Sequence, residues 1–219
     1  MRIGVFGDSF VEKTRYTWAD RLQTQYGHEI IGHGASGSSL IWSARQVDYH
    51  AAEFDLVIWA MTSLPRLSVQ KTDKWYHFTE FSQPFPNDLE IDTKRKVFGQ
   101  YLKYVHDWHN ECWQWQHIVQ SLMTKWQNIM IMPCFQDPLF VEFSLYQLCE
   151  REAQCYFPGR SIVDIYQGWD DLRPGHLCEE NHDILARDIQ QKLVPGIYQT
   201  SYEVFTMPTC PQSHYWSRK

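Results

Sequence analysis

The sequence predicts an α/β fold, a three-layer sandwich in which a central parallel sheet is covered by helices on both faces. Two observations carry this prediction. Strand and helix patterns alternate regularly through residues 1–61, and the strand patterns are unbroken apolar runs, which is typical of strands buried on both faces. The chain has 219 residues, of which 43% are hydrophobic and 21% charged, so it can bury one sizeable core.

The first three predicted strands alternate with two predicted helices. The strands are expected at residues 2–6, 29–32 and 55–61, and the helices at residues 17–26 and 40–53. Thr17 is a suitable N-cap for the first helix, Asp20 lies in its first turn, and Gly27 is a suitable stop. Continuous apolar strands separated by helices predict that the strands run parallel.

The rest of the chain is less regular. Residues 66 to about 96 are rich in Pro, Asp and Lys without a clear pattern, and residues 97–127 predict a long helix that is broken at most once. Further elements are expected as a strand at 128–133, a helix at 143–154, a weaker strand at 161–166 and a last helix from 177 or 178 to 193. We expect one domain over residues 1–196, with an aromatic-rich insertion at about 66–127, and a C-terminal tail at 197–219.

The composition excludes several classes of function. With 20 basic and 26 acidic residues, the formal charge of −6 argues against a general nucleic-acid-binding protein. No apolar run approaches the length of a membrane-spanning helix, and residues 1–6 read as a buried strand, not as a secretory signal. We therefore expect a cytoplasmic protein, with carriage in a larger particle such as a virion as the alternative. The six cysteines form no C-x-x-C pair, which favours free thiols.

The residues with catalytic potential follow the predicted strands. In a parallel sheet, ligands bind beyond the carboxyl ends of the strands. Ser9 follows the first strand directly, Gly37 lies in the small-residue loop after the second, and Thr62 and Ser63 follow the third. Backbone N–H groups that converge near Ser9 would suit an oxyanion. The plainer reading is that Ser9 caps a turn and that Gly37, or the competing Gly34, is only a turn glycine.

A serine hydroxyl is a weak nucleophile and needs a general base. His176 meets this need, because it follows the turn-forming Pro174-Gly175 and directly precedes the last predicted helix. Asp171 and Asp170 lie just upstream and can orient an imidazole. The plainer reading is a surface histidine at the entry to a helix.

Two segments of the chain resemble sequence blocks of the GDSL or SGNH hydrolases. Gly7-Asp8-Ser9-Phe10 near the N-terminus resembles block I, and His176 with the helix pattern of residues 177–186 resembles the last block. Gly37 fits the block II glycine. The resemblance implies a flavodoxin-like α/β/α fold and the hydrolysis of esters, thioesters or acyl groups on sugars and lipids. It does not extend to the middle of the chain or to the tail.

By position, this resemblance implies that Ser9 is the nucleophile and that the backbone N–H groups of Ser9 and Gly37 form part of the oxyanion hole. The sequence departs from the family after the third strand, where the expected Asn is missing. Thr62 or Ser63 would then donate a hydroxyl hydrogen bond instead, or Arg66 would lend its charge. Loss of one such donor costs about 2.7–4 kcal/mol of transition-state stabilisation.

The resemblance also implies that His176 is the general base. The family places an Asp three residues before this His, but that position is Arg173 here. Asp171, or else Asp170, would orient the imidazole. Otherwise the site is a Ser–His dyad in which a backbone carbonyl does so.

We therefore expect a serine hydrolase that cleaves an acyl ester, for example O-acetyl groups on a glycan, without a metal or organic cofactor. Its partner is an ester or acylated carbohydrate substrate. The alternative is a module of the same fold without chemistry, which serves in glycan binding or structural assembly. The insertion or the tail would then contact a second copy or a larger assembly.

The aromatic and histidine residues of the insertion leave further alternatives. The Trp and Tyr residues between positions 97 and 126 predict core and subunit packing, or an aromatic wall along a substrate groove. His106, His109 and His117 fall near one helical face, but no second segment offers matched ligands. They therefore indicate a polar helix surface and not a metal site.

Overall fold

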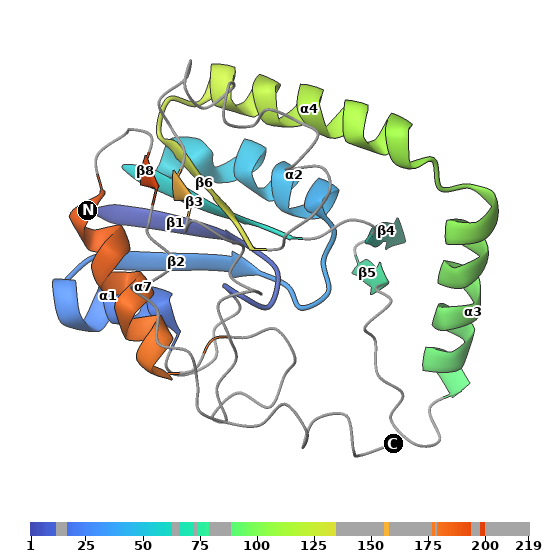
Figure 1. The fold of residues 1–219 in the computed structure, drawn as a ribbon, viewed down its shortest axis with the longest axis horizontal. Helices are drawn as coiled ribbons and strands as arrows, with labels where there is room; N and C mark the ends of the chain where they lie inside the picture. The colour runs from blue at the N-terminus through green and yellow to red at the C-terminus, as the bar shows by residue number, and fades with distance from the viewer. Residues whose placement is uncertain are drawn as a thin grey trace.

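The fold is seen in a computed structural model that describes residues 1–11, 17–62, 66–71, 74–78, 89–134, 156–157, 177, 179–193 and 198–199. Its centre is a four-stranded sheet with the order β2-β1-β3-β6 (Figure 1). The strands are β1 (Arg2–Gly7), β2 (Glu29–Gly34), β3 (Leu56–Met61) and β6 (Ile129–Pro133). All neighbouring strands are parallel, so four of the five predicted strands and their direction are confirmed.

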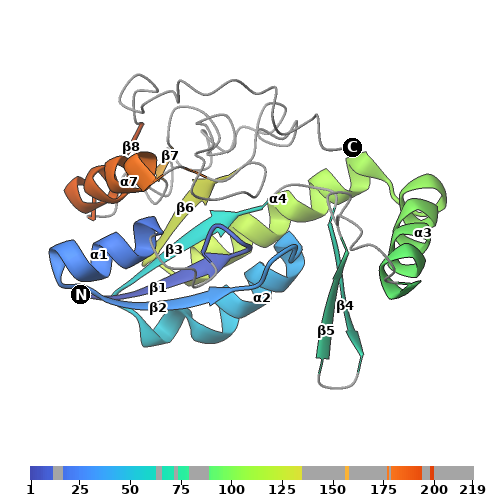
Figure 2. The ribbon, with the colours of Figure 1, turned by 90° about the horizontal axis from the view of Figure 1, so that it is seen from below.

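Helices cover both faces of the sheet. The covering helices are α1 (Trp18–Tyr26), α2 (Leu40–His50), α4 (Trp108–Lys125) and α7 (Glu179–Gln191). Ile58 of β3 packs in the core cluster that α1 and α7 cover, and its neighbour Trp59 packs in the cluster that α2 and α4 cover. The three layers are visible in Figure 2, where the sheet lies between α1 with α7 and α2. The predicted three-layer architecture is confirmed.

Local sequence signals define α1 as expected. Thr17 is the N-cap and accepts a hydrogen bond from the Asp20 N–H, while the Asp20 side chain accepts one from the Thr17 N–H. This reciprocal capping box satisfies two backbone donors that a helix start otherwise leaves open. Gly27 ends the helix with a left-handed φ of 72°, which a residue with a Cβ adopts only at a cost.

The prediction of irregular structure from residue 66 to about 96 is wrong in two places. Strands β4 (Leu67–Lys71) and β5 (Lys74–Phe78) form an antiparallel hairpin, which lies beyond the carboxyl ends of the central strands (Figure 2). Helix α3 (Leu89–Tyr104) begins before residue 97. The first turns of α3 are mostly charged in sequence, and the two hairpin strands have only five residues each, so both signals are weak.

The long helix predicted over residues 97–127 is broken once, between α3 and α4. Asp107 is the N-cap of α4 and accepts a hydrogen bond from the Asn110 N–H. A smaller difference occurs after α2, where residues 51–53 form a 3₁₀ turn, η1 (Ala51–Glu53), in place of a continued α-helix.

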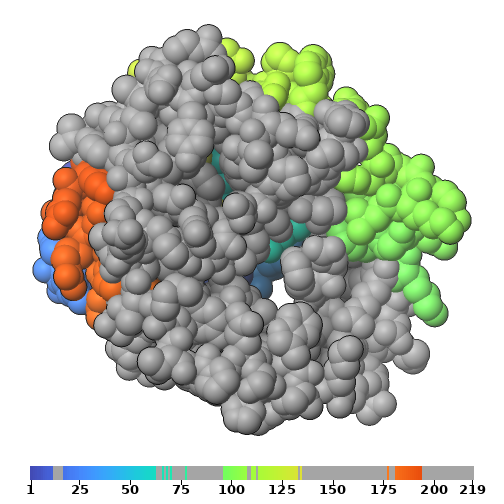
Figure 3. Space-filling view, viewed as in Figure 1, coloured from blue at the N-terminus to red at the C-terminus, as the bar shows by residue number. Residues whose placement is uncertain are grey.

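In the space-filling view, α7 lies on one side of the molecule and α3 with α4 on the other (Figure 3).

The C-terminal part is described only in short pieces. The last predicted helix is confirmed as α7. In the tail, β8 (Tyr198–Gln199) pairs in parallel with β7 (Tyr156–Phe157), so this stretch of the tail is paired within the chain. The helix predicted at 143–154 and the strand predicted at 161–166 lie outside the described residues, and the single-domain division stays a prediction. Within the part that the structure describes, no helix combines the length and apolarity needed to cross a membrane.

Candidate functional site

The carboxyl ends of three neighbouring strands meet at one edge of the sheet. Asp8 follows β1, Thr62 follows β3 and Cys134 follows β6. All three side chains are buried. The Thr62 hydroxyl donates a hydrogen bond of 2.8 Å to Asp8 Oδ2, and the Cys134 N–H donates one of 2.9 Å to the Met61 carbonyl. The parallel sheet therefore gathers polar groups where ligand sites of such sheets lie.

Asp8 carries a negative charge into this edge, and Arg66 compensates it. Arg66 Nη1 lies 2.5 Å from Asp8 Oδ2, and the two side chains are 7% and 0% exposed. The other carboxylate oxygen, Oδ1, accepts a hydrogen bond of 3.1 Å from the Phe10 N–H. A buried carboxylate is costly unless it is paired and hydrogen-bonded, and here both oxygens have partners.

Ser9 lies inside the turn that these contacts hold. The Val11 N–H donates to the Asp8 carbonyl at 3.1 Å and closes the turn around Ser9. Phe10 and Val11 are buried in the core cluster under α1 and α7. The turn is thus fixed by its own hydrogen bonds and by the apolar packing of the two residues after Ser9.

Close backbone packing leads into this turn. A Cβ atom at Gly7 would lie 2.5 Å from the Ala60 carbonyl oxygen of β3. Only glycine permits β1 and β3 to approach so closely at this point. The position of Ser9 relative to β3 therefore depends on the residue two places before it.

The loop that carries Gly37 is bonded to the same strand end. The Ala35 N–H and the Ser38 hydroxyl both donate to the Gly7 carbonyl, each at 3.3 Å. Gly37 has a φ of 72°, a left-handed conformation that favours glycine. The Gly37 loop therefore lies beside the Ser9 turn, as the sequence predicts, while the role of the Gly37 N–H as an oxyanion donor stays a prediction.

A serine–histidine pair that sequence reasoning missed joins the hairpin to this loop. Ser68 of β4 and His77 of β5 face each other in the hairpin register, and Ser68 Oγ lies 2.7 Å from His77 Nδ1. The Ser39 N–H donates to the same hydroxyl at 2.9 Å. The His77 ring also packs edge-on against Trp42, and burial lowers the pKa of His77. Sequence reasoning missed this pair because it missed the hairpin, and only the register of the hairpin brings Ser68 and His77 together.

The structure thus brings some predicted site residues together, while others lie outside the residues that it describes. Ser9, Gly37 and Thr62 belong to the same edge of the sheet. His176, Asp171, Asp170 and Ser63 lie outside the described residues, so the meeting of Ser9 with His176 stays a prediction. The nearest described neighbour of the histidine is Leu177, which is buried in the core cluster that also contains Phe10 and Val11.

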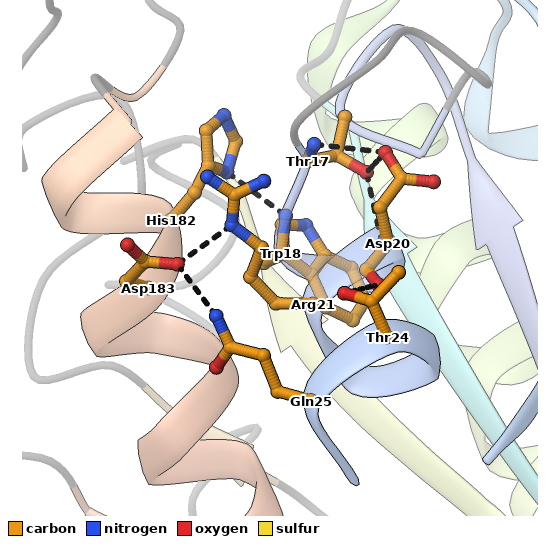
Figure 4. A network of polar contacts seen from close by, with 8 residues as sticks. All are labelled: Thr17, Trp18, Asp20, Arg21, Thr24, Gln25, His182 and Asp183. Atoms are coloured by element: carbon orange, nitrogen blue, oxygen red, sulfur yellow. Dashed lines mark hydrogen bonds and ion pairs between the residues drawn. The ribbon is translucent and has the colours of Figure 1, made fainter. Parts of the chain in front are cut away.

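Polar contacts also fix the start of α7, the helix that follows the predicted base. His182 Nδ1 accepts a hydrogen bond of 3.1 Å from the Trp18 N–H at the start of α1. Asp183 pairs with Arg21 at 2.6 Å and accepts a hydrogen bond from Gln25 at 3.2 Å. Figure 4 shows these side chains between the two helices. His182 therefore has a structural partner at the junction of α1 and α7.

One cysteine and two histidines among the described residues have structural surroundings that argue against a catalytic or metal-binding role. Burial, together with the nearby Asp8 charge, raises the pKa of the Cys134 thiol well above its usual value, although Arg66 opposes this shift. The free thiol is therefore neutral. His106 pairs with Glu111, and His117 contacts the edge of Trp113. Across the described ranges, no three His, Cys, Asp or Glu side chains are grouped as metal ligands would be.

Comparison with known proteins supports the fold through structure alone. No protein-family model matches the chain, and no curated protein sequence matches it. The structure of TesA is similar with a TM-score of 0.53 at 13% identity, covering 89% of this chain and 99% of TesA. The acetyl xylan esterase AlAXEase is similar with a TM-score of 0.54 at 12% identity, covering 89% and 100%.

A third structure extends the same likeness. A protein assigned to the G-D-S-L family from Desulfitobacterium hafniense DCB-2 is similar with a TM-score of 0.51 at 11% identity, covering 88% of this chain and 99% of that protein. At such low identity the likeness is one of fold. It confirms the architecture that the resemblance to SGNH hydrolases predicts.

Proposed function

We propose that this protein is a serine hydrolase that cleaves an acyl ester, with Ser9 as the nucleophile. The observation that carries the proposal is the position of Ser9. It lies at the carboxyl end of a central strand, in a turn held by the Asp8 carboxylate, next to the Gly37 loop. The fold is shared with proteins that are named esterases, which supports this reaction class.

In the proposed reaction, Ser9 Oγ attacks the ester carbonyl carbon and His176 accepts the hydroxyl proton. The bond between the carbonyl carbon and the alcohol oxygen then breaks, and His176 returns the proton to the leaving alcohol. His176 then deprotonates a water, whose oxygen attacks the acyl-serine carbonyl; the bond to Ser9 Oγ breaks, His176 returns the proton to Ser9 Oγ, and the acid is released. Asp171 orients the imidazole and stabilises its protonated form.

The oxyanion of each tetrahedral intermediate is held by the backbone N–H groups of Ser9 and Gly37 in this proposal. A third donor is assigned to the residues after β3, Thr62 or Ser63. Because Thr62 already donates its hydroxyl hydrogen to Asp8, we favour Ser63 as the direct donor. Thr62 then contributes by holding Asp8.

The proposed substrate is an acyl ester, with acetyl groups on a carbohydrate as the first class to test. One of the similar folds belongs to a protein named as an acetyl xylan esterase, which motivates this choice. A short acyl chain also needs no long apolar tunnel, so it can be tested on simple chromogenic esters before a glycan is chosen.

The test compares the wild type with Ser9→Ala on p-nitrophenyl acetate and on acetylated xylan. We expect Ser9→Ala to lower kcat by roughly 10⁴-fold or more, since the nucleophile is lost. A fluorophosphonate should label the wild type at Ser9, as located by peptide mass spectrometry. Ser121→Ala, which changes an exposed serine of α4, is the matched control. Equal rates for wild type and Ser9→Ala, with no label on Ser9, would refute the proposal for simple esters.

A second candidate function is a binding or assembly module without chemistry. The observation that favours it is a set of exposed apolar side chains on α3, α4 and the turn between them, namely Val97, Tyr104, Val105 and Trp113. Such side chains suit contact with a sugar face or another protein. Binding of xylan fragments that survives Ser9→Ala, without turnover by the wild type, would favour this candidate.

A further inference from the structure

Asp8 is the one carboxylate that is fully buried among the residues that the structure describes. Its position is not explained by packing, because an apolar residue would fill the same space without the cost of burying a charge. Its two oxygens instead connect two separate segments of the chain. Each of these segments carries a residue of the proposed site.

The Oδ1 oxygen serves the Ser9 turn. It accepts the Phe10 N–H, so the side chain before Ser9 is bonded to the backbone after it. This Asx-type contact restrains the backbone on both sides of Ser9. Any rotation of the carboxylate changes this contact directly.

The Oδ2 oxygen serves the segment after β3. It accepts the Thr62 hydroxyl at 2.8 Å and pairs with Arg66 Nη1 at 2.5 Å. These two residues stand at the ends of the stretch 62–66, which contains Ser63. One oxygen atom thus anchors this stretch at both ends and ties it to Ser9.

We propose that Arg66 is a positioning residue for Ser9, acting through Asp8. This inference rests on the proposed function for its catalytic consequence. Arg66 supplies the charge that keeps the Asp8 carboxylate in place, and Asp8 in turn holds the Ser9 turn and the stretch 62–66 together. Without the guanidinium, a buried carboxylate loses its only charged partner among the described residues. It then moves toward water or other donors, and the Ser9 turn loosens.

The nature of the arginine side chain is part of the inference. A guanidinium is planar, permanently charged and rigid, whereas a lysine ammonium is a strongly hydrated point charge. Arg66→Lys therefore keeps the charge but loses part of the orientation. Arg66→Met keeps most of the apolar stem and loses the charge altogether.

The experiment uses the full chain and two independent readouts. The first is amide hydrogen exchange at Phe10 and Val11, which reports the order of the Ser9 turn. The second is kcat and KM for p-nitrophenyl acetate. Arg2→Met is the matched control, because it removes an arginine that also pairs with an acid, at the opposite end of β1.

For Arg66→Met we expect exchange at Phe10 and Val11 to rise by about tenfold or more beyond the rise in the amides of β3, which report the loss of global stability. We expect kcat to fall by about 10²-fold, the order of loss that a displacement of roughly 1 Å causes, with KM nearly unchanged. Arg66→Lys should recover part of kcat. Arg2→Met should leave both readouts close to wild type.

The double variant Asp8→Asn/Arg66→Met separates positioning from simple charge balance. It removes both charges, so we expect thermal stability to return toward wild type while kcat stays low. If Arg66→Met alone does not fold, the double variant and Arg66→Lys still decide the question. A double variant with wild-type kcat, or unchanged exchange at Phe10 and Val11 in Arg66→Met, would overturn the inference.

Failure of the proposed function gives a different pattern. If the wild type hydrolyses no ester and a fluorophosphonate does not label Ser9, the catalytic proposal fails. The exchange measurement still decides whether Arg66 holds the turn, because it needs no substrate. Faster exchange in Arg66→Met would then support the positioning contact, and unchanged exchange would refute it.

Discussion

Two polar clusters in this molecule join distant segments through ion pairs of nearly equal length. At the edge of the sheet, Arg66 and Asp8 are 58 residues apart and lie at 2.5 Å. Between α1 and α7, Arg21 and Asp183 are 162 residues apart and lie at 2.6 Å. The pairs differ in their contact with water. The Asp8 side chain is fully buried, whereas that of Asp183 is 38% exposed.

From this difference we expect burial, more than distance, to determine how much stability is lost when one partner of an ion pair is removed. An exposed acid that loses its partner is solvated by water, so little is lost. A buried acid that loses its partner remains as an uncompensated charge. We therefore expect the α1–α7 cluster to tolerate the loss of one partner. In the Asp8 cluster, loss of one partner should cost much more stability.

The largest expected effect on stability comes from breaking the buried pair. Arg66→Met should lower the free energy of unfolding by about 3–5 kcal/mol, the usual cost of leaving one charge of a buried pair alone. Urea denaturation followed by circular dichroism measures this change. In the variant Asp8→Asn/Arg66→Met most of the loss should be recovered. A loss below about 1 kcal/mol for Arg66→Met would place this pair in the same class as a surface pair.

A smaller effect is expected at the α1–α7 interface. Arg21→Met should lower the free energy of unfolding by about 1–2 kcal/mol, because Arg21 is buried but Asp183 can be hydrated in the variant. The same denaturation measurement applies. A loss as large as that of Arg66→Met would contradict the conclusion that burial separates the two clusters.

Acidification should lower the free energy of unfolding through two histidines. Burial is the main cause that lowers the pKa of both His33 and His77, and the nearby His50 adds to it for His33. Because a histidine in the unfolded chain titrates near about 6.5, the unfolded state binds more protons than the folded state below that pH. The stability contribution of the two neutral histidines is therefore fully present above about pH 6.5. It is lost as the pH falls toward their lowered pKa values in the folded state.

Urea midpoints measured at about pH 7.5 and about pH 5.5 test this expectation. His33→Phe should show a flatter dependence on pH, because it keeps the stacking on Phe6 and removes one titrating group. His77 bonds to Ser68 in the hairpin, so loss of its stability contribution should be seen first as faster exchange at the Ser39 N–H. A midpoint that rises on acidification would contradict the sign of this prediction.

The smallest effect is expected at the surface. Lys125 pairs with Asp48 at 2.6 Å, the same length as the α1–α7 pair, but the two side chains are 52% and 42% exposed. Lys125→Met should change the free energy of unfolding by less than about 1 kcal/mol, and the difference from wild type should shrink further in high salt. A larger change would show that a short distance between the charged atoms stabilises the protein even when both side chains are exposed.

The fold was predictable where local chemistry and burial agree. The apolar runs of β1 and β3, and the capping residues Thr17 and Gly27, each act within a few residues of chain. The start of α3 was not predictable because its residues are mostly polar, and the β4–β5 hairpin was not predictable because its strands are only five residues long each. Tertiary context, not propensity, determines such elements.

The candidate site divides in the same way. Ser9, Gly37 and Thr62 lie at one edge because parallel strands bring their carboxyl ends together, while their catalytic roles stay predictions. Asp8 holds its own loop through the bond from the Phe10 N–H. The contact between Asp8 and Arg66 was not predictable, because it depends on where the chain returns after β3. The positions of His176 and Asp171 relative to Ser9 stay predictions.

The close contact at Gly7 has a consequence for protein engineering. Since a methyl group there would press on the Ala60 carbonyl oxygen, substitution at this position would separate two adjoining strands. If the proposed function holds, changes of substrate preference are therefore to be introduced through the loops that follow the strands. Gly7 should be kept unchanged in every variant, so that libraries vary only the loops and leave the contact between β1 and β3 intact.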